Sequence, residues 1–150
     1  MAMNVENLKI GVVTALFNRP VTEKLQAGAL GELEKQGLKP EQIISVEVPG
    51  AFEIPLAAQA LLERGCDGVV TVGAVIRGDT AHFDFVCNAA ERGCTELQLK
   101  YSKPVGFGVI TTENAEQAYA RAGGEKGNKG AEASEVVLTM IKILGEIQNK

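Results

Sequence analysis

Tryptophan is absent from this chain of 150 residues, histidine occurs once, and cysteine occurs three times. One histidine and the scattered Cys66, Cys87 and Cys94 do not supply ligands at metal-binding spacing, so we expect no metal site. The number of cysteines is odd, and none of them forms a Cys-x-x-Cys pair with metal-ligand spacing. Free thiols are typical of a reducing compartment, and we expect these three to be structural.

The chain also lacks a basic run and a long apolar segment. Its net charge is −4, with acidic and basic residues interspersed, so we expect neither nucleic acid nor a membrane surface as a partner. No secretory leader precedes the first apolar run, which favours a cytoplasmic location. With 45% hydrophobic and 23% charged residues, the composition is that of one ordinary globular domain spanning residues 1–150.

Short apolar runs alternate with helical segments along the chain. Residues 9–16, 43–48, 68–76 and 105–110 are predicted strands, since they are short, apolar and bounded by turn residues. Predicted helices cover residues 20–36, 52–64, about 81–101, 112–121 with Thr112 as N-cap, and a last segment after the polar loop 123–130 that reaches about residue 147. This alternation predicts an α/β fold, a three-layer α/β/α sandwich with a four-stranded parallel sheet.

So small a sheet leaves two exposed edges, and a partner subunit is the natural cover for them. Residues 3–6 are predicted to add a strand to such a neighbour. Ligands of open parallel sheets bind beyond the carboxyl ends of the strands, which places the chemistry near residues 17–18, 50–53 and 77–82.

His82, the only histidine, is predicted to lie where a polar loop enters a helix at that rim. It could exchange protons near neutral pH or only cap the helix. The loop from Arg77 to Thr80 could bind phosphate at the helix N-terminus, or be an ordinary turn with Asp79 or Thr80 as N-cap. Asp79 would weaken anion binding if its carboxylate faced the phosphate, so it should point elsewhere or act as a cap.

Four further side chains have two interpretations each. Phe17 and Phe52 could stack on a planar ring or pack in the core, and spacing alone favours the core. Glu53 could face a polar ligand or cap a helix. Arg121 could bind an anion or only complement the end of its helix.

The glycine- and lysine-rich segment 123–130 is not a phosphate-binding loop, because no Ser or Thr follows the lysine and no strand precedes it. The dinucleotide glycine fingerprint is missing as well. No nucleotide cofactor is therefore expected.

Five segments in order resemble the lumazine synthase family over about residues 9–147. They are Phe17-Asn18, VPGAFEIP (48–55), GAVIRGDTAHFDFV (73–86), PVGFGVITTENAEQA (104–118), and RAG followed by GNKGAEA (121–133). The resemblance implies a flavodoxin-like fold. It also implies condensation of 5-amino-6-ribitylaminouracil with 3,4-dihydroxy-2-butanone 4-phosphate to 6,7-dimethyl-8-ribityllumazine, with release of phosphate and water and without a cofactor.

The resemblance makes His82 the proton-transferring residue. It assigns substrate binding to Phe17, Ala51, Phe52, Glu53, Ala74, Val75, Ile76, Asp79, Thr80, Phe107, Arg121 and Lys129. Among these, Phe17 would stack on the pyrimidine, Glu53 would accept from the ribityl hydroxyls, and Arg121 would pair with the phosphate. Phe107 and Arg121 would come from an adjacent subunit.

The family's assembly implies pentamers, and the short GNKG segment favours a closed shell of about 60 subunits, with riboflavin synthase as a further partner. Three rival functions remain: an archaeal-type riboflavin synthase, a non-catalytic flavin- or lumazine-binding shell protein, and a flavodoxin-like electron carrier. The retained anion turn and Arg121 argue against the first. Phe17, His82 and Arg121 argue against the second, and a colourless preparation would argue against the third.

Overall fold

A computed structural model describes residues 4–150 and contains the expected parallel sheet. Its strands are β1 (Ile10–Ala15), β2 (Ile43–Val48), β3 (Gly68–Ile76) and β4 (Val105–Thr112), in the order β2-β1-β3-β4. All three pairings are parallel. The predicted four-stranded α/β architecture is confirmed.

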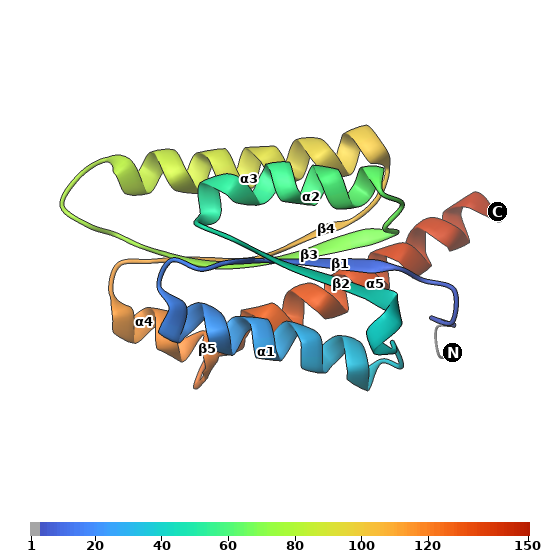
Figure 1. Cartoon of the computed structure of the whole chain (residues 1–150), viewed down its shortest axis with the longest axis horizontal. Helices are drawn as coiled ribbons and strands as arrows, with labels where there is room; N and C mark the ends of the chain where they lie inside the picture. The colour runs from blue at the N-terminus through green and yellow to red at the C-terminus, as the bar shows by residue number, and fades with distance from the viewer. Residues whose placement is uncertain (1–3) are drawn as a thin grey trace.

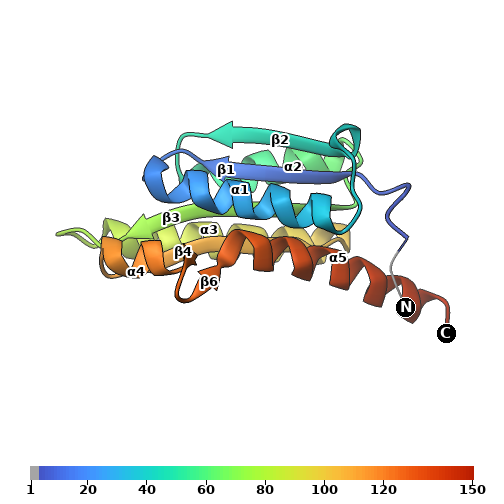
Figure 2. The ribbon, with the colours of Figure 1, turned by 90° about the horizontal axis from the view of Figure 1, so that it is seen from below.

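Helices cover both faces of the sheet (Figure 1). One face carries α2 (Ile54–Glu63) and α3 (His82–Tyr101), and the other carries α1 (Arg19–Lys35), α4 (Ala115–Ala120) and α5 (Lys129–Gln148). Seen from below, α1 and α5 run side by side under the strands (Figure 2), and they share a close contact. Two single turns of 3-10 helix, η1 (Pro40–Gln42) and η2 (Ala51–Glu53), flank β2.

The sheet separates two apolar clusters. Along β1 every residue is buried, because helices cover both of its faces. Ile10 and Val12 face α1 and α5, whereas Val13 and Ala15 face α2 and α3. This alternation follows from the two-residue period of a strand.

The start of α4 differs from the sequence prediction. Thr112 does not cap α4, because β4 stays paired with β3 as far as the register pair Ile76 and Thr112. The N-cap is Asn114, whose side chain accepts a hydrogen bond from the Gln117 backbone N–H at 2.8 Å. Sheet pairing therefore overrides the capping preference of the threonine.

Segment 123–130 is not a plain loop. It contributes to a small antiparallel hairpin of β5 (Ala122–Gly124) and β6 (Gly127–Asn128), and α5 already begins at Lys129. Gly123 and Gly127 have φ values of 103° and 82°, which favour glycine and allow the tight reversal. These two glycines therefore allow the chain to reverse direction between β5 and β6.

Asn128 joins this hairpin to two helices. Its Oδ1 accepts hydrogen bonds from the Gly130 and Ala131 N–H groups at the start of α5, and its Nδ2 donates to the Lys24 carbonyl of α1. A Cβ at Gly28 would collide with the Asn128 side chain, so the glycine makes room for this contact.

The N-terminal segment lies at the amino end of the sheet. Met3 falls outside the described residues, and residues 4–6 form no strand within this chain, so strand addition to a neighbour stays a prediction. The Gln42 amide donates to the Val5 and Leu8 carbonyls at 2.6 and 2.9 Å and holds the segment in place. Within residues 4–150, no helix combines the length and apolarity needed to cross a membrane.

Candidate active site

A pocket of about 660 Å³ opens at the carboxyl end of the sheet. It lies where β1 and β3 diverge, since the chain leaves β1 toward β2 on one side and leaves β3 toward β4 on the other. Open α/β sheets bind ligands at such a point. The pocket is lined by Phe17, Asn18, Pro49, Gly50, Ala51, Phe52, Glu53, Ala74, Val75, Ile76, Gly78, Thr80, His82, Phe83 and Val86.

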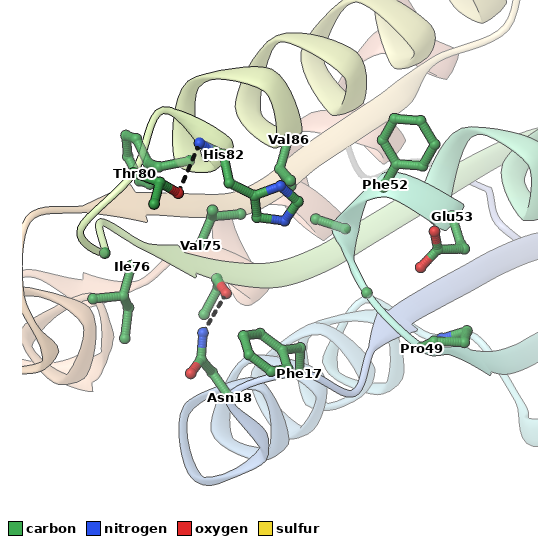
Figure 3. Close-up of a pocket in the computed structure, with 15 residues that line it drawn as sticks. Phe17, Asn18, Pro49, Phe52, Glu53, Val75, Ile76, Thr80, His82 and Val86 are labelled. Carbon is green, nitrogen blue, oxygen red and sulfur yellow. Dashed lines mark hydrogen bonds between the residues drawn. The ribbon is translucent and has the colours of Figure 1, made fainter.

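Two aromatic rings border the pocket instead of packing in the core. Phe17 is 72% exposed and Phe52 is 62% exposed, so the core interpretation that spacing favoured is wrong. Both rings follow the ends of strands, and they come from different elements (Figure 3). Exposed apolar rings beside a cavity are suited to stacking on a flat ligand.

The backbone fixes the turn that carries Phe17. The Leu16 and Phe17 N–H groups donate to the Val48 and Pro49 carbonyls at 2.8 and 3.0 Å. Asn18 has φ of 64°, and its Nδ2 donates to the Ala74 carbonyl at 2.8 Å. Asn18 was not among the predicted site residues, although it stands beside Phe17 in a motif that the sequence comparison had marked.

His82 is the first residue of α3, and its imidazole points toward the pocket from that helix (Figure 3). Its backbone N–H donates to the Thr80 Oγ1 at 3.3 Å, but within residues 4–150 the imidazole itself has no hydrogen-bond partner. The N-cap position belongs to Ala81, and no side chain caps the helix there. The exposed imidazole is therefore free to meet a ligand, and neither it nor Asp79 is a cap.

Glu53 ends the 3-10 turn η2 and occupies the N-cap position of α2. Its side chain makes no capping hydrogen bond, so the interpretation of Glu53 as a helix cap is wrong. Instead, the side chain lines the pocket beside Phe52 and Pro49 (Figure 3). A carboxylate in this place can accept hydrogen bonds from hydroxyl groups of a ligand.

Arg77 ties together the two loops beside the pocket. Its Nε pairs with Glu113 at 2.7 Å, its Nη2 lies 3.5 Å from Asp84, and its guanidinium stacks 4.3 Å from the centroid of the Phe83 ring. Phe83 lines the pocket, so Arg77 links the pocket wall to the loop after β4. The sequence marked Arg77 only as part of the anion turn, and Phe83 only through its motif.

Four predicted site residues do not line the pocket of this single chain. Asp79 is exposed on the turn, between the lining residues Gly78 and Thr80. Phe107 is 39% exposed on the edge strand β4. Arg121 follows α4 and donates from Nη1 to the Gln117 carbonyl at 2.9 Å, and Lys129 pairs with Glu132 at 3.4 Å.

The three thiols lie outside the pocket. Burial raises the pKa of the Cys94 thiol to about 11, and it also raises the pKa values of Cys66 and Cys87. A raised pKa keeps these sulfurs protonated and unreactive near neutral pH. Within residues 4–150, no cluster of three or more His, Cys, Asp or Glu side chains could hold a metal ion.

The chain is similar to known proteins of one family. Residues 7–145 match the family model described as 6,7-dimethyl-8-ribityllumazine synthase. A protein of that name from Bdellovibrio bacteriovorus is 57% identical over 93% of this chain and 77% of its own length. Namesakes from Coxiella burnetii and Cytophaga hutchinsonii are 47% and 49% identical, over 97% and 92% of this chain and 97% and 87% of their own lengths. The chain belongs to the 6,7-dimethyl-8-ribityllumazine synthase family, whose members are enzymes of riboflavin biosynthesis.

Proposed function

We propose that this chain condenses 5-amino-6-ribitylaminouracil with 3,4-dihydroxy-2-butanone 4-phosphate. The product is 6,7-dimethyl-8-ribityllumazine, and phosphate and water are released. The observation that carries the proposal is the pocket itself, which gathers two exposed phenyl rings, a carboxylate and an imidazole at one rim of the sheet. These groups would serve the pyrimidine ring, the ribityl chain and the proton transfers of the reaction.

The aminopyrimidine would lie flat on Phe17, with its ribityl chain directed along Ala51, Phe52 and Glu53. The Glu53 carboxylate would accept hydrogen bonds from the ribityl hydroxyls. The backbone of Ala74, Val75 and Ile76 at the end of β3 would form the pocket floor, which the family resemblance also assigns to the substrate.

The phosphate would bind at the start of α3, where the positive end of the helix dipole attracts anions. Thr80 lines the pocket at this point, and Asp79 would contribute its backbone N–H. Arg121 is the counter-charge expected for the phosphate, since a guanidinium can pair with two phosphate oxygens.

His82 would move the protons. The substrate amine attacks the ketone, and loss of water gives an imine, which requires a proton for the leaving oxygen. A carbon–hydrogen bond then gives up its proton as the phosphate leaves, and the second nitrogen closes the ring with loss of water. A single imidazole can take and return these protons near neutral pH.

Arg121, Phe107 and Lys129 lie outside the pocket of their own chain, which supports a site shared between subunits. We propose a homo-oligomer of pentamers in which a neighbour supplies Phe107 and Arg121. Closure of the pentamers into a shell, with riboflavin synthase as a partner, and residence in the cytoplasm belong to the same proposal.

The test mixes the purified protein with both substrates and follows the absorbance of the lumazine product and the phosphate released. We expect product above the spontaneous rate, with one phosphate for each lumazine. Tight binding of riboflavin without turnover would instead indicate a binding shell. Conversion of lumazine to riboflavin without the phosphorylated substrate would indicate a riboflavin synthase, and tightly bound FMN would indicate an electron carrier.

A further inference from the structure

A single side chain bridges the floor of the crevice between β1 and β3. The pairing of these strands ends at Thr14 and Val72, whereas β3 stays paired with β4 as far as Ile76. Beyond Val72, β3 has therefore lost its partner on the β1 side. There the Asn18 Nδ2 donates to the Ala74 carbonyl at 2.8 Å, where a longer β1 would have supplied a backbone N–H (Figure 3).

This use of Asn18 is unusual for its position. An asparagine at the N-cap of a helix normally accepts hydrogen bonds from the first turn, but the Asn18 side chain makes no capping bond to α1. Its backbone carbonyl accepts from the Val21 and Thr22 N–H groups, and Pro20 brings no N–H that needs a partner. The amide is consequently free to reach across to β3.

The backbone of Asn18 points to the same conclusion. Its φ of 64° lies in the left-handed region, which residues other than glycine rarely adopt and which asparagine tolerates best. This conformation turns the chain sharply from β1 into α1 directly after Phe17. The direction of the Phe17 side chain therefore depends on how Asn18 is held.

Little else in the chain can hold the Phe17 ring, because 72% of its surface is exposed. On the β2 side, the Phe17 N–H is tied to the Pro49 carbonyl at 3.0 Å. On the β3 side, a side-chain hydrogen bond anchors the turn across the crevice. Among residues 4–150, the bond from Asn18 to the Ala74 carbonyl is the only one of this kind. The ring thus stands between two hydrogen-bonded anchors, a backbone bond on the β2 side and the Asn18 side chain on the β3 side.

We propose that Asn18 is a positioning residue that fixes the Phe17 ring for stacking on the aminopyrimidine substrate. This inference rests on the proposed function and goes beyond it, since it assigns substrate affinity to a residue that does not itself need to touch the ring. Without the Asn18 bond, the turn samples several directions, and the stacked geometry is populated less. Binding of the aromatic substrate should suffer, while binding of the phosphorylated substrate should not.

Two variants separate the hydrogen bond from the backbone conformation. Asn18→Gly keeps the left-handed turn and removes the bond, and Asn18→Asp keeps the shape but replaces the donor by a carboxylate. We expect the KM for the aminopyrimidine to rise about tenfold in both, the factor typical of one lost hydrogen bond. The KM for the butanone phosphate should stay within about twofold, because the phosphate lies at the other end of the pocket.

Gln42→Ala is the matched control. It removes another side-chain amide that holds a segment by bonding to backbone carbonyls, but at the opposite end of the sheet. This variant should lower thermal stability and leave both KM values unchanged. Unchanged KM values in both Asn18 variants, or a rise for both substrates alike, would overturn the proposal.

A double-mutant cycle with Phe17→Ala tests whether Asn18 acts through the ring. If it does, Asn18→Gly has no further effect on the aminopyrimidine KM once the ring is gone. Additive effects would contradict the inference and indicate a separate role. A wild-type protein that forms no lumazine would contradict the proposed function. Turnover by wild type together with additive effects of the two substitutions on KM would contradict only this inference.

Discussion

The exposure of Phe17 and Phe52 decides between a place in the core and a place at the pocket. An apolar ring that faces water beside a cavity loses the burial energy that would otherwise hold it in the core, of about 1.5–3 kcal/mol for a phenylalanine. The sequence predicted that both rings follow the ends of strands. It could not predict their exposure, because that depends on where the strands diverge in space.

We expect His82→Ala and Arg121→Ala to impair different parts of the reaction. Bringing two substrates together can contribute ~7–11 kcal/mol, whereas general acid–base help contributes only ~10²–10⁴-fold. His82→Ala should therefore lower kcat but leave a slow, measurable enzyme. Arg121→Ala should lower kcat/KM further, because it would remove the proposed anchor of the phosphorylated substrate.

Steady-state kinetics with each substrate varied in turn measure both effects. Arg64→Ala, an exposed arginine at the opposite rim, serves as the control and should behave like wild type. A larger loss of kcat/KM for His82→Ala than for Arg121→Ala would contradict this division of roles.

The buried thiol of Cys94 makes stability depend on pH in the alkaline range. Burial raises its pKa from 9.0 to about 11, so the folded state keeps a proton that the unfolded chain loses. The contribution is complete below about pH 9 and is lost as the pH rises through 11. The denaturation midpoint of wild type should fall over this range more steeply than that of Cys94→Ala. Parallel pH profiles would show that Cys94 does not contribute.

At the scale of elements, Arg77 joins the loop after β3 to the loop after β4. Replacing it by alanine removes the 2.7 Å pair with Glu113 and the stacking on Phe83. Because the ion pairs are largely exposed, we expect at most about 1 kcal/mol of lost stability. The pocket wall should become less rigid, however, and the KM values for the two substrates should rise several-fold.

Arg77→Lys keeps the charge but not the planar stacking surface. Glu113→Gln removes the pair with Glu113 and leaves the Asp84 contact and the stacking in place. Comparing their KM values with that of Arg77→Ala shows whether stacking or charge matters. Equal KM values in wild type and Arg77→Ala would exclude a role for this link in the pocket.

Two glycines of α1 should respond oppositely to alanine. At Gly31 an added Cβ meets nothing within 4 Å, so Gly31→Ala should stabilise the helix by about 0.5–1 kcal/mol. At Gly28 the Cβ would displace the Asn128 side chain, which caps α5, and we expect a loss of about 1–2 kcal/mol. The midpoints of urea denaturation, measured at the same protein concentration, compare the stabilities of the two variants with wild type. A shift of the midpoint in the same direction in both variants would refute this account.

The strands were predictable because each is a short, largely apolar run bounded by turn residues. The cap of α4 was not, since Thr112 and Asn114 are both capping residues, and only the register with β3 decides between them. The β5–β6 hairpin was missed because glycines at positive φ look the same in sequence as those of a loop.

For the whole molecule, Phe107, Arg121 and Lys129 lie away from the pocket of their own chain. The motifs assigned these residues to the substrate site, but pattern alone could not say whether they would lie at the pocket of their own chain or of another copy. The hydrogen bond from Asn18 to Ala74 was not predicted for a related reason, because the two residues lie 56 positions apart in the chain. Contacts between residues that are distant in the sequence depend on the fold.

Mixing two impaired variants tests whether sites are shared between subunits. His82→Ala and Arg121→Ala chains, unfolded together and reassembled, should form some sites that combine an intact His82 with a neighbour's intact Arg121. With equal amounts, about a quarter of the sites are complete, so activity should rise clearly above either parent. No gain over the parents, in assemblies verified as mixed by native mass spectrometry, would place both residues in one chain.

The separation between the two rims of the sheet has a practical consequence. The pocket residues follow the carboxyl ends of the strands, whereas the turn at Arg64 and Gly65 is exposed at the amino end. A Cβ at Gly65 would meet nothing within 4 Å, although its φ of 109° favours glycine. A fluorescent label or short peptide tag introduced at Arg64 would report on the molecule from a place remote from its chemistry.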